Sequence, residues 1–96
     1  MGALSRFDVA EYSGVFMVVV ESDLLPSDPS VVVIPLLPDY PAVKHLNPVI
    51  RHDGQDLVLA TRLIAAVRRS SVRDHGHVAD QGDLITRAVD ILMAGV

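Results

Sequence analysis

Residues 15–36 read VFMVVVESDLLPSDPSVVVIPL, and this stretch sets the fold class of the 96-residue chain. The runs at 15–21 and 31–36 are short and rich in β-branched residues, which favours two buried strands. Asp, Pro and Ser recur through residues 22–30 between them, so this segment is predicted to be a loop. The pair Leu24-Leu25 stands inside that polar loop, where two large aliphatic side chains either fold back onto the core or contact a partner.

Two turn signals extend this pattern into an antiparallel sheet. Ser13-Gly14 separates a candidate strand at 6–12 from the first of the two runs, and Gly supplies the positive φ that a tight hairpin needs. Asp53-Gly54 lies between apolar runs at 48–52 and 56–61. Asp-Gly in such a setting is the strongest short signal for a hairpin.

Three further segments give less direct signals. Pro35 favours an edge strand or a strand end, because proline cannot donate a hydrogen bond to a ladder. Residues 62–72 are ambiguous, since 63–67 could begin a helix whereas 68–73 look like an exposed, extended segment. Residues 74–82 are polar and are predicted to form a loop.

Apolar residues at helical spacing predict an amphipathic helix over residues 83–94. Asp80 or Asp83 is expected to cap its start, and Gly95 fits the left-handed position after its end. The sum is a mainly β (α+β) fold, a small SH3-like barrel or curved antiparallel sheet of five or more strands with one C-terminal helix. The length predicts one domain, residues 1–96. The apolar face of the helix consists of Leu84, Ile85, Ala88, Ile91 and Leu92.

The composition excludes several classes of protein. Half of the residues are hydrophobic, 16 are Val and only four are aromatic, which predicts an ordered chain with an aliphatic core. Without Cys there are no disulfides or thiolate metal sites. A net charge of −4 does not favour direct nucleic-acid binding. No apolar run approaches the ~20 residues that span a membrane. Arg6, Asp8 and Glu11 occupy the place of a signal peptide, so we expect a cytoplasmic protein.

Two of the four histidines are candidate metal ligands. The motif His75-x-His77 could hold a metal, and Asp74 and Asp80 lie nearby in the sequence. Zinc normally needs three or four ligands in an ordered arrangement, so a solvated loop is the stronger interpretation. His45 and His52 are isolated and are expected at the surface of a strand or loop.

Residues 68–73 read RRSSVR and form the one basic cluster of the sequence. Such a cluster could bind phosphate or an acidic peptide, and it also fits an exposed strand edge protected by charge. No ordered Ser, His and Asp set, Gly-rich phosphate loop or paired-carboxylate motif is seen in the sequence. We therefore expect neither an enzymatic activity nor a cofactor.

Three segments, taken in order, resemble the CcdB family of toxins from plasmid and chromosomal toxin–antitoxin modules. They are VFMVVVESDLLPSDPSVVVIPL at 15–36, LNPVI at 46–50 and AVDILMAGV at 88–96. In that family a strand leads into Ser-Asp and two aliphatic residues, and a Pro-containing loop and a strand ending in Val-Ile-Pro-Leu follow. The similarity runs from about Arg6 to Val96, at nearly the same length.

The resemblance implies a fold, a mechanism and partners. The family fold is a barrel-like sheet with a long C-terminal helix, related to the MazF/Kid toxins, and its members are homodimers whose C-terminal helices lie near the two-fold axis. The best-studied members are not enzymes: they bind the A subunit of DNA gyrase and trap its complex with cleaved DNA. A CcdA-like antitoxin, a DNA-binding protein with a disordered tail, neutralises the toxin, and the two together repress their operon.

The resemblance maps the family's gyrase contacts onto two places, and it assigns no residues to the antitoxin. The paired aliphatic residues of the loop correspond to Leu24 and Leu25. The contacts at the C-terminus correspond to Asp90, Met93, Ala94, Gly95 and Val96. The active toxins carry an aromatic pair, the second a Trp, where this chain has Met93 and Ala94, and an Asn where it has Asp90.

Four functions remain open on these observations. The first is a CcdB-like toxin that poisons gyrase or another topoisomerase, as in plasmid maintenance. The second is the same fold without the toxic contact, retained for antitoxin binding and operon regulation. The third, a MazF-like endoribonuclease, is disfavoured, because that family has an Arg-Pro segment after its first loop where this chain reads Pro29-Ser30-Val31. The fourth is an unrelated β-domain that binds a peptide.

Overall fold

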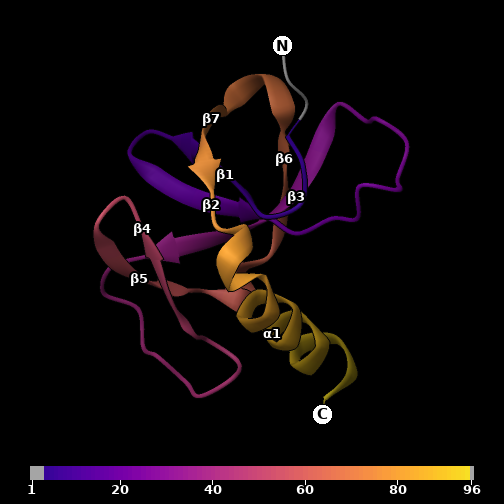
Figure 1. Ribbon diagram of the computed structural model, residues 1–96. Helices are drawn as coiled ribbons and strands as arrows, with labels where there is room; N and C mark the ends of the chain where they lie inside the picture. Colours follow the sequence, from indigo (N-terminus) through magenta and orange to yellow (C-terminus); the bar gives the residue numbers. More distant parts are fainter. Residues whose placement is uncertain (1–3, 96) are drawn as a thin grey trace.

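The structure is a computed structural model that describes residues 4–95. In this part of the chain a curled antiparallel sheet carries one α-helix, α1 (Gly82–Ala94), on one of its faces (Figure 1). The predicted mainly β fold with a curved antiparallel sheet and a C-terminal helix is thus confirmed. The strands are β1 (Asp8–Tyr12), β2 (Val15–Val19), β3 (Ser30–Leu37), β4 (Val49–His52), β5 (Gln55–Leu59), β6 (Ala65–Arg68) and β7 (Arg73–His77).

β3 is the central strand. β2 pairs along one of its edges, while β6 and then β5 pair along the other. Pro35 therefore lies inside a central strand, and the prediction of an edge or a strand end is wrong. The β6 ladder ends at Val33 and the β5 ladder begins at Leu36. Pro35 falls between them, with its carbonyl accepting from the Ala60 N–H at 2.9 Å, so its missing N–H interrupts neither ladder.

Both predicted hairpins are present. Ser13-Gly14 joins β1 to β2 and Asp53-Gly54 joins β4 to β5, and all four residues have positive φ angles. Positive φ at both central residues is the requirement of the two-residue turn that matches the twist of the strands. The second turn pairs His52 with Gln55, and this register directs His52 inward on the same face as Ile50.

The second half of the chain differs from the predictions. β6 is a strand and not the start of a helix, because it pairs with the first half of β3. β7 replaces a predicted loop: it pairs with β1, and all five of its residues are exposed, so it has no apolar alternation. α1 follows a 3₁₀ turn at Ala79–Gln81, and neither Asp80 nor Asp83 caps its start through a side chain.

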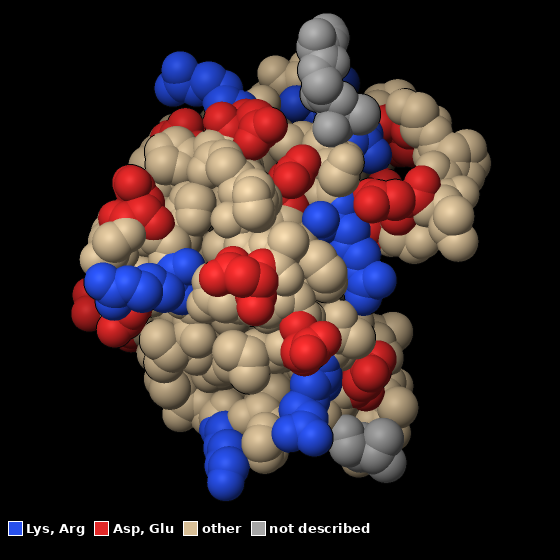
Figure 2. Space-filling model, in the orientation of Figure 1, with Lys and Arg blue, Asp and Glu red and all other residues tan. Residues whose placement is uncertain are grey.

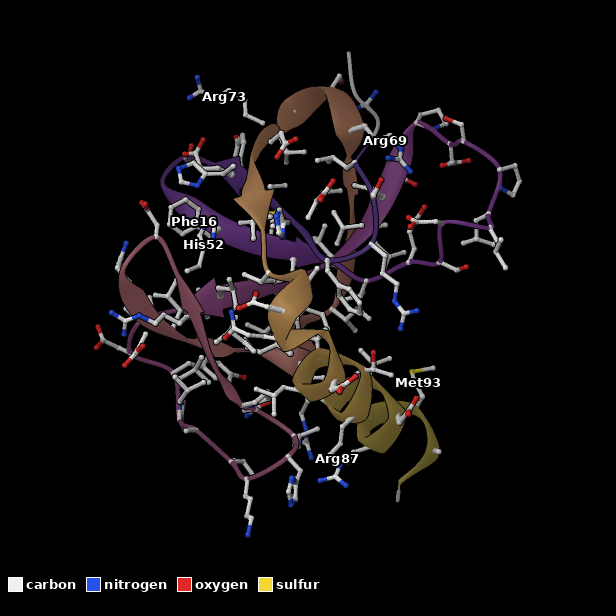
Figure 3. All side chains as sticks on the ribbon, viewed as in Figure 1. Phe16, His52, Arg69, Arg73, Arg87 and Met93 are labelled. Atoms are coloured by element: carbon white, nitrogen blue, oxygen red, sulfur yellow. The ribbon has the colours of Figure 1, made fainter. Side chains whose placement is uncertain are left out.

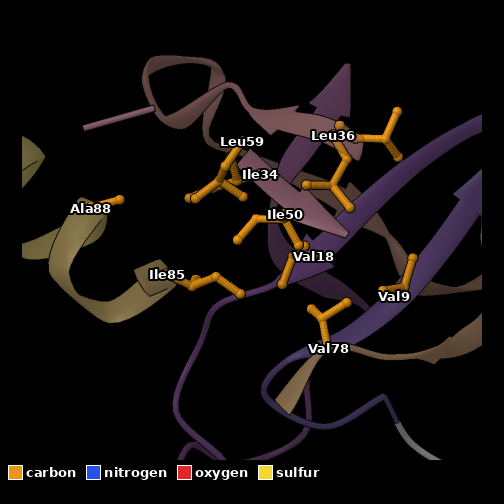
Figure 4. Packing of buried hydrophobic residues seen from close by; sticks show 10 residues of the cluster. Val9, Val18, Ile34, Leu36, Ile50, Leu59, Val78, Ile85 and Ala88 are labelled. Carbon is orange, nitrogen blue, oxygen red and sulfur yellow. The ribbon is translucent and has the colours of Figure 1, made fainter. Parts of the chain in front are cut away.

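The core is aliphatic, as the composition predicts, and forms two layers. Ile85 and Ala88 of α1 pack in the first layer (Figure 4). Leu84, predicted on the same helix face, is 46% exposed. The sheet side of the first layer consists of Val9, Val18, Ile34, Leu36, Ile50, Leu57 and Leu59, with Val78 beside them. The second layer consists of Ala10, Met17, Val19, Val31 and Val33.

Side-chain contacts join the first and last strands in the order of the sheet, β4 and β7. Gln81, which follows β7, accepts a hydrogen bond from the Arg51 N–H and donates one to the Arg51 carbonyl, both at 2.8 Å. The ring nitrogens of His52 and His75 lie 3.1 Å apart. The Gln81 amide thus bonds the backbone N–H and carbonyl of Arg51 at the free edge of β4, in place of a neighbouring strand.

We expect Gln81→Ala to destabilise the protein by about 1–2 kcal/mol, because two hydrogen bonds to the β4 edge are exchanged for water. The free energy of unfolding in urea measures the change. Gln55→Ala is the matched control, since the Gln55 side chain is exposed and should contribute no more than about 0.5 kcal/mol. Equal losses in the two variants would show that the Gln81 amide does not close the sheet.

Candidate functional site

Residues 22–29, here called the leucine loop, project from the body of the protein between β2 and β3 (Figure 1). Leu24 is 94% exposed and Leu25 is 57% exposed. Neither side chain is buried, so the interpretation in which they fold back onto the core is wrong. Leu25 instead borders an open groove of about 270 Å³ that Glu21 and Arg69 also line.

Polar contacts support the leucine loop. The Arg6 N–H donates to the Asp23 carboxylate at 2.8 Å. Asp28 accepts hydrogen bonds from the N–H and the hydroxyl of Ser30, at 3.0 and 2.8 Å, and these bonds hold the pKa of Asp28 below its ordinary value. The conformation of the loop therefore depends on hydrogen bonds to its carboxylates and less on apolar packing.

The C-terminal end of α1 presents the second set of predicted contact residues. Asp90, Met93, Ala94 and Gly95 are all exposed, Met93 by 75%, and Figure 3 shows Met93 on the outer side of the helix. Gly95 has φ 74° and its N–H donates at 2.8 Å to the carbonyl four residues earlier, so the predicted left-handed helix end is confirmed. Val96 lies outside the described residues.

Arg6 connects the leucine loop to α1. Its backbone N–H bonds Asp23 of the loop, and its guanidinium donates to the Thr86 hydroxyl of α1 at 3.0 Å. The guanidinium also lies over the Phe7 ring, 4.7 Å from the centroid. In residues 4–95 no hydrogen bond or ion pair joins the loop directly to the end of the helix. The two segments that the resemblance predicts to contact a target are therefore separate, and Arg6 bonds to the loop and to α1.

The basic segment 68–73 does not form a continuous patch. Arg69 pairs with Glu21 at 3.1 Å and Arg73 pairs with Glu11 at 3.6 Å, and Figure 3 shows the two arginines well apart. Acidic and basic side chains alternate over the face shown in Figure 2. Arg73 lies on β7, the last strand of the sheet, which agrees with the interpretation of a strand edge protected by charge.

The histidines form an arrangement that the sequence reading missed. His52 is 9% exposed, and Figure 3 shows it beside Phe16; their ring centroids are 5.0 Å apart. His52 Nε2 lies 3.1 Å from His75 Nδ1, and the ring centroids of Phe16 and His75 are 4.5 Å apart. The predicted surface position of His52 is therefore wrong. Its two-residue spacing from Ile50 was the signal that could have placed it inside.

The structure does not support a metal site at His75 and His77. Within residues 4–95 no group of three or more His, Asp or Glu side chains is arranged to hold a metal ion. His75 faces His52 across the sheet instead. Burial lowers the pKa of His52, and the neighbouring His75 lowers it further.

A curled sheet with two exposed leucines on one loop and an exposed helix end has the features of a small protein-binding domain. The model of the CcdB protein family matches residues 6–95. The chain therefore belongs to the CcdB family, a family of non-enzymatic toxins from toxin–antitoxin modules. A search of the curated proteins found no significant match. Among residues 4–95, no helix has the length and apolar character needed to cross a membrane.

The lowered pKa of His52 predicts a loss of stability in mild acid. Unfolded histidine takes up a proton near about pH 6.5, whereas buried His52 resists it, so the free energy of unfolding falls as the pH drops below that value. We expect the wild type to lose more stability between about pH 7.5 and about pH 5.5 than His52→Gln, measured by urea denaturation. Exposed His77→Gln is the control and should retain the pH dependence of the wild type. Identical pH dependence in His52→Gln would assign the effect to other groups.

Proposed function

We propose that this chain is the toxin of a toxin–antitoxin module and that it inhibits DNA gyrase by binding its A subunit. The leucine loop and the C-terminal end of α1 form the contact. Membership of the CcdB family supports the proposal. The observation that carries it furthest is the exposure of Leu24, because a leucine that is 94% exposed on a loop contributes little to packing within one chain.

Each contact segment has a distinct part in binding. Leu24 and Leu25 enter an apolar site on the target, where burying each is worth about 1.5–3 kcal/mol. Met93 adds a flexible apolar side chain at the end of α1, and its thioether adapts to irregular surfaces. The protein acts by occupying a surface of gyrase while the DNA is cleaved, so the contacts and not a chemical step of the toxin account for the inhibition.

The proposal includes the partners of the family. Residues 1–96 act as a single toxin domain in the cytoplasm, as a homodimer that a CcdA-like antitoxin neutralises with its disordered tail. Leu84 on α1 and Leu63 before β6 are each 46% exposed, and they suit an interface with a second copy of the chain. No residues are assigned to the antitoxin contact.

A second candidate function is favoured by two residues at the helix end. Ala94 has no aromatic ring to stack, and Asp90 adds a charge that must lose water on binding. A CcdB homologue with these residues could retain its antitoxin and its part in operon regulation while its target differs. Toxicity, and not fold or antitoxin binding, separates the two candidates.

The direct test is the cleavage of supercoiled plasmid by purified gyrase in the presence of this protein. We expect linear DNA to accumulate after denaturation of the enzyme, because the toxin stabilises the complex with cleaved DNA. A variant that lacks residues 93–96 should not produce it, since it lacks the helix end. Circular dichroism of this variant should remain close to that of the wild type, because Met93, Ala94 and Gly95 are outside both core layers.

The outcome that would sink the gyrase proposal is an absence of cleaved DNA at a large molar excess of folded toxin. Normal growth of bacteria that express the protein, together with tight binding to the product of the neighbouring antitoxin gene, would support the second candidate instead. RNA cleavage by the purified protein would favour the hypothesis of a MazF-like endoribonuclease.

Restoring an aromatic residue at the helix end should strengthen the gyrase contact. Trp side chains are frequent hot spots worth at least about 2 kcal/mol, and 2.8 kcal/mol corresponds to roughly a hundredfold in affinity. We expect Ala94→Trp to lower the Kd for the gyrase A subunit by about ten- to a hundredfold, measured by surface plasmon resonance. Asp83→Trp, at an exposed position in the first turn of α1, is the control. An equal gain in both variants would point to non-specific aromatic binding.

A further inference from the structure

No residue of the leucine loop belongs to either core layer, so apolar packing does not fix its conformation. Its two leucines are exposed, and the groove of about 270 Å³ beside Leu25 separates part of it from the body of the protein. Ordering each loop residue costs about 1–2 kcal/mol of conformational entropy. The contacts that offset this cost must be found at the ends of the loop and among its polar groups.

One side chain joins the two ends of the leucine loop. Arg69 Nη2 donates to Glu21, just before the loop, at 3.1 Å, and Arg69 Nε donates to the carbonyl of Asp28, near its end, at 2.7 Å. The Arg69 N–H donates to the Pro29 carbonyl at 2.8 Å. Arg69 thus closes the loop at its base with three hydrogen bonds to both of its ends.

The partners of Arg69 are themselves held in place. The second oxygen of the Glu21 carboxylate accepts the Val32 N–H of β3 at 3.0 Å, so this carboxylate is fixed to the central strand. The side chains of Arg69 and Glu21 are 23% and 15% exposed, which limits the screening of their ion pair by water. A planar guanidinium can donate in two directions at once, whereas a Lys ammonium on its flexible stem cannot reproduce this geometry.

We propose that Arg69 is a positioning residue for target binding: it holds the leucine loop in the conformation that presents Leu24 and Leu25, and it acts through the loop without touching the target. This inference rests on the proposed function of the loop. The neighbouring Arg68 carries the same charge, is exposed, and in residues 4–95 forms neither a hydrogen bond nor an ion pair to the loop. Figure 3 shows Arg69 directed from the segment after β6 toward the base of the loop.

The first experiment measures the loop itself. Hydrogen exchange of the free protein should become faster at residues 22–29 in Arg69→Gln and to a smaller extent in Arg69→Lys, while Arg68→Gln leaves it unchanged. Exchange in β2 and β3 should stay slow in all three variants, because the core layers are untouched. Unchanged exchange of the loop in folded Arg69→Gln would overturn the inference, whether or not the protein binds gyrase.

The second experiment measures binding to the gyrase A subunit. Arg69→Gln should raise the Kd by about tenfold, because the target must then order the loop, and Arg68→Gln should not. In a Leu24→Ser/Leu25→Ser background Arg69→Gln should have no further effect, since the side chains through which Arg69 acts are gone. An undiminished effect in that background, or an unchanged Kd despite faster exchange, would overturn the positioning role. If the wild type does not bind gyrase, the proposed function fails, and the exchange experiment still decides whether Arg69 holds the loop.

Discussion

The change of pairing partner along β3 is the constraint on which the rest of the fold depends. β3 has eight residues, and one of its edges is shared between β6 and β5. Two strands can follow one another along an edge only where the ladder is interrupted. Pro35 stands at this interruption and has no N–H to leave unpaired. A residue that usually weakens a central strand is therefore suited to this one position.

The two halves of β3, which pair with β6 and with β5, contribute to different apolar layers. Val31 and Val33 of β3 point to one face with the layer near β6, while Ile34 and Leu36 point to the other face, toward α1. α1 contributes to the first layer only, and neither layer includes a residue of the leucine loop. Its leucines are exposed, and polar contacts hold the loop at its base.

The sequence predicted those parts of the fold in which local chemistry and burial agree. Ser13-Gly14 and Asp53-Gly54 identified both hairpins, and the strands around them were placed within two residues of their observed bounds. β7 escaped prediction because all of its residues are exposed, and it exists only through its pairing with β1. β6 was ambiguous for a similar reason, since its pairing with β3 is a long-range contact.

The sequence likewise predicted some residues of the candidate site and not others. The resemblance to the CcdB family predicted a contact at Leu24, whereas the polar loop around it left burial and exposure both open. The sequence did not predict that Arg69 contacts the leucine loop. This contact depends on Glu21, which is 48 positions away in the sequence and next to Arg69 in the fold. The inward His52 was visible in principle through strand alternation, whereas its partner His75 lay in a strand that no pattern revealed.

The two contact segments differ in how their charges are satisfied. The carboxylates at the loop are used internally, since Asp23, Asp28 and Glu21 all accept hydrogen bonds from this chain. Asp90 is exposed near the end of α1, where the last turn carries no basic residue and the helix dipole contributes partial negative charge. These hydrogen bonds lower the cost of bringing the loop carboxylates near an apolar surface of a target.

At the helix end a target must either supply a cation for Asp90 or leave the carboxylate in water. An aromatic residue at position 94 would add apolar contact without removing that requirement. The free energy gained by an apolar contact at position 94 and the cost of desolvating Asp90 are thus separate contributions to binding. If the proposed contacts hold, the helix end, more than the loop, is where the target of this chain would differ from that of its family.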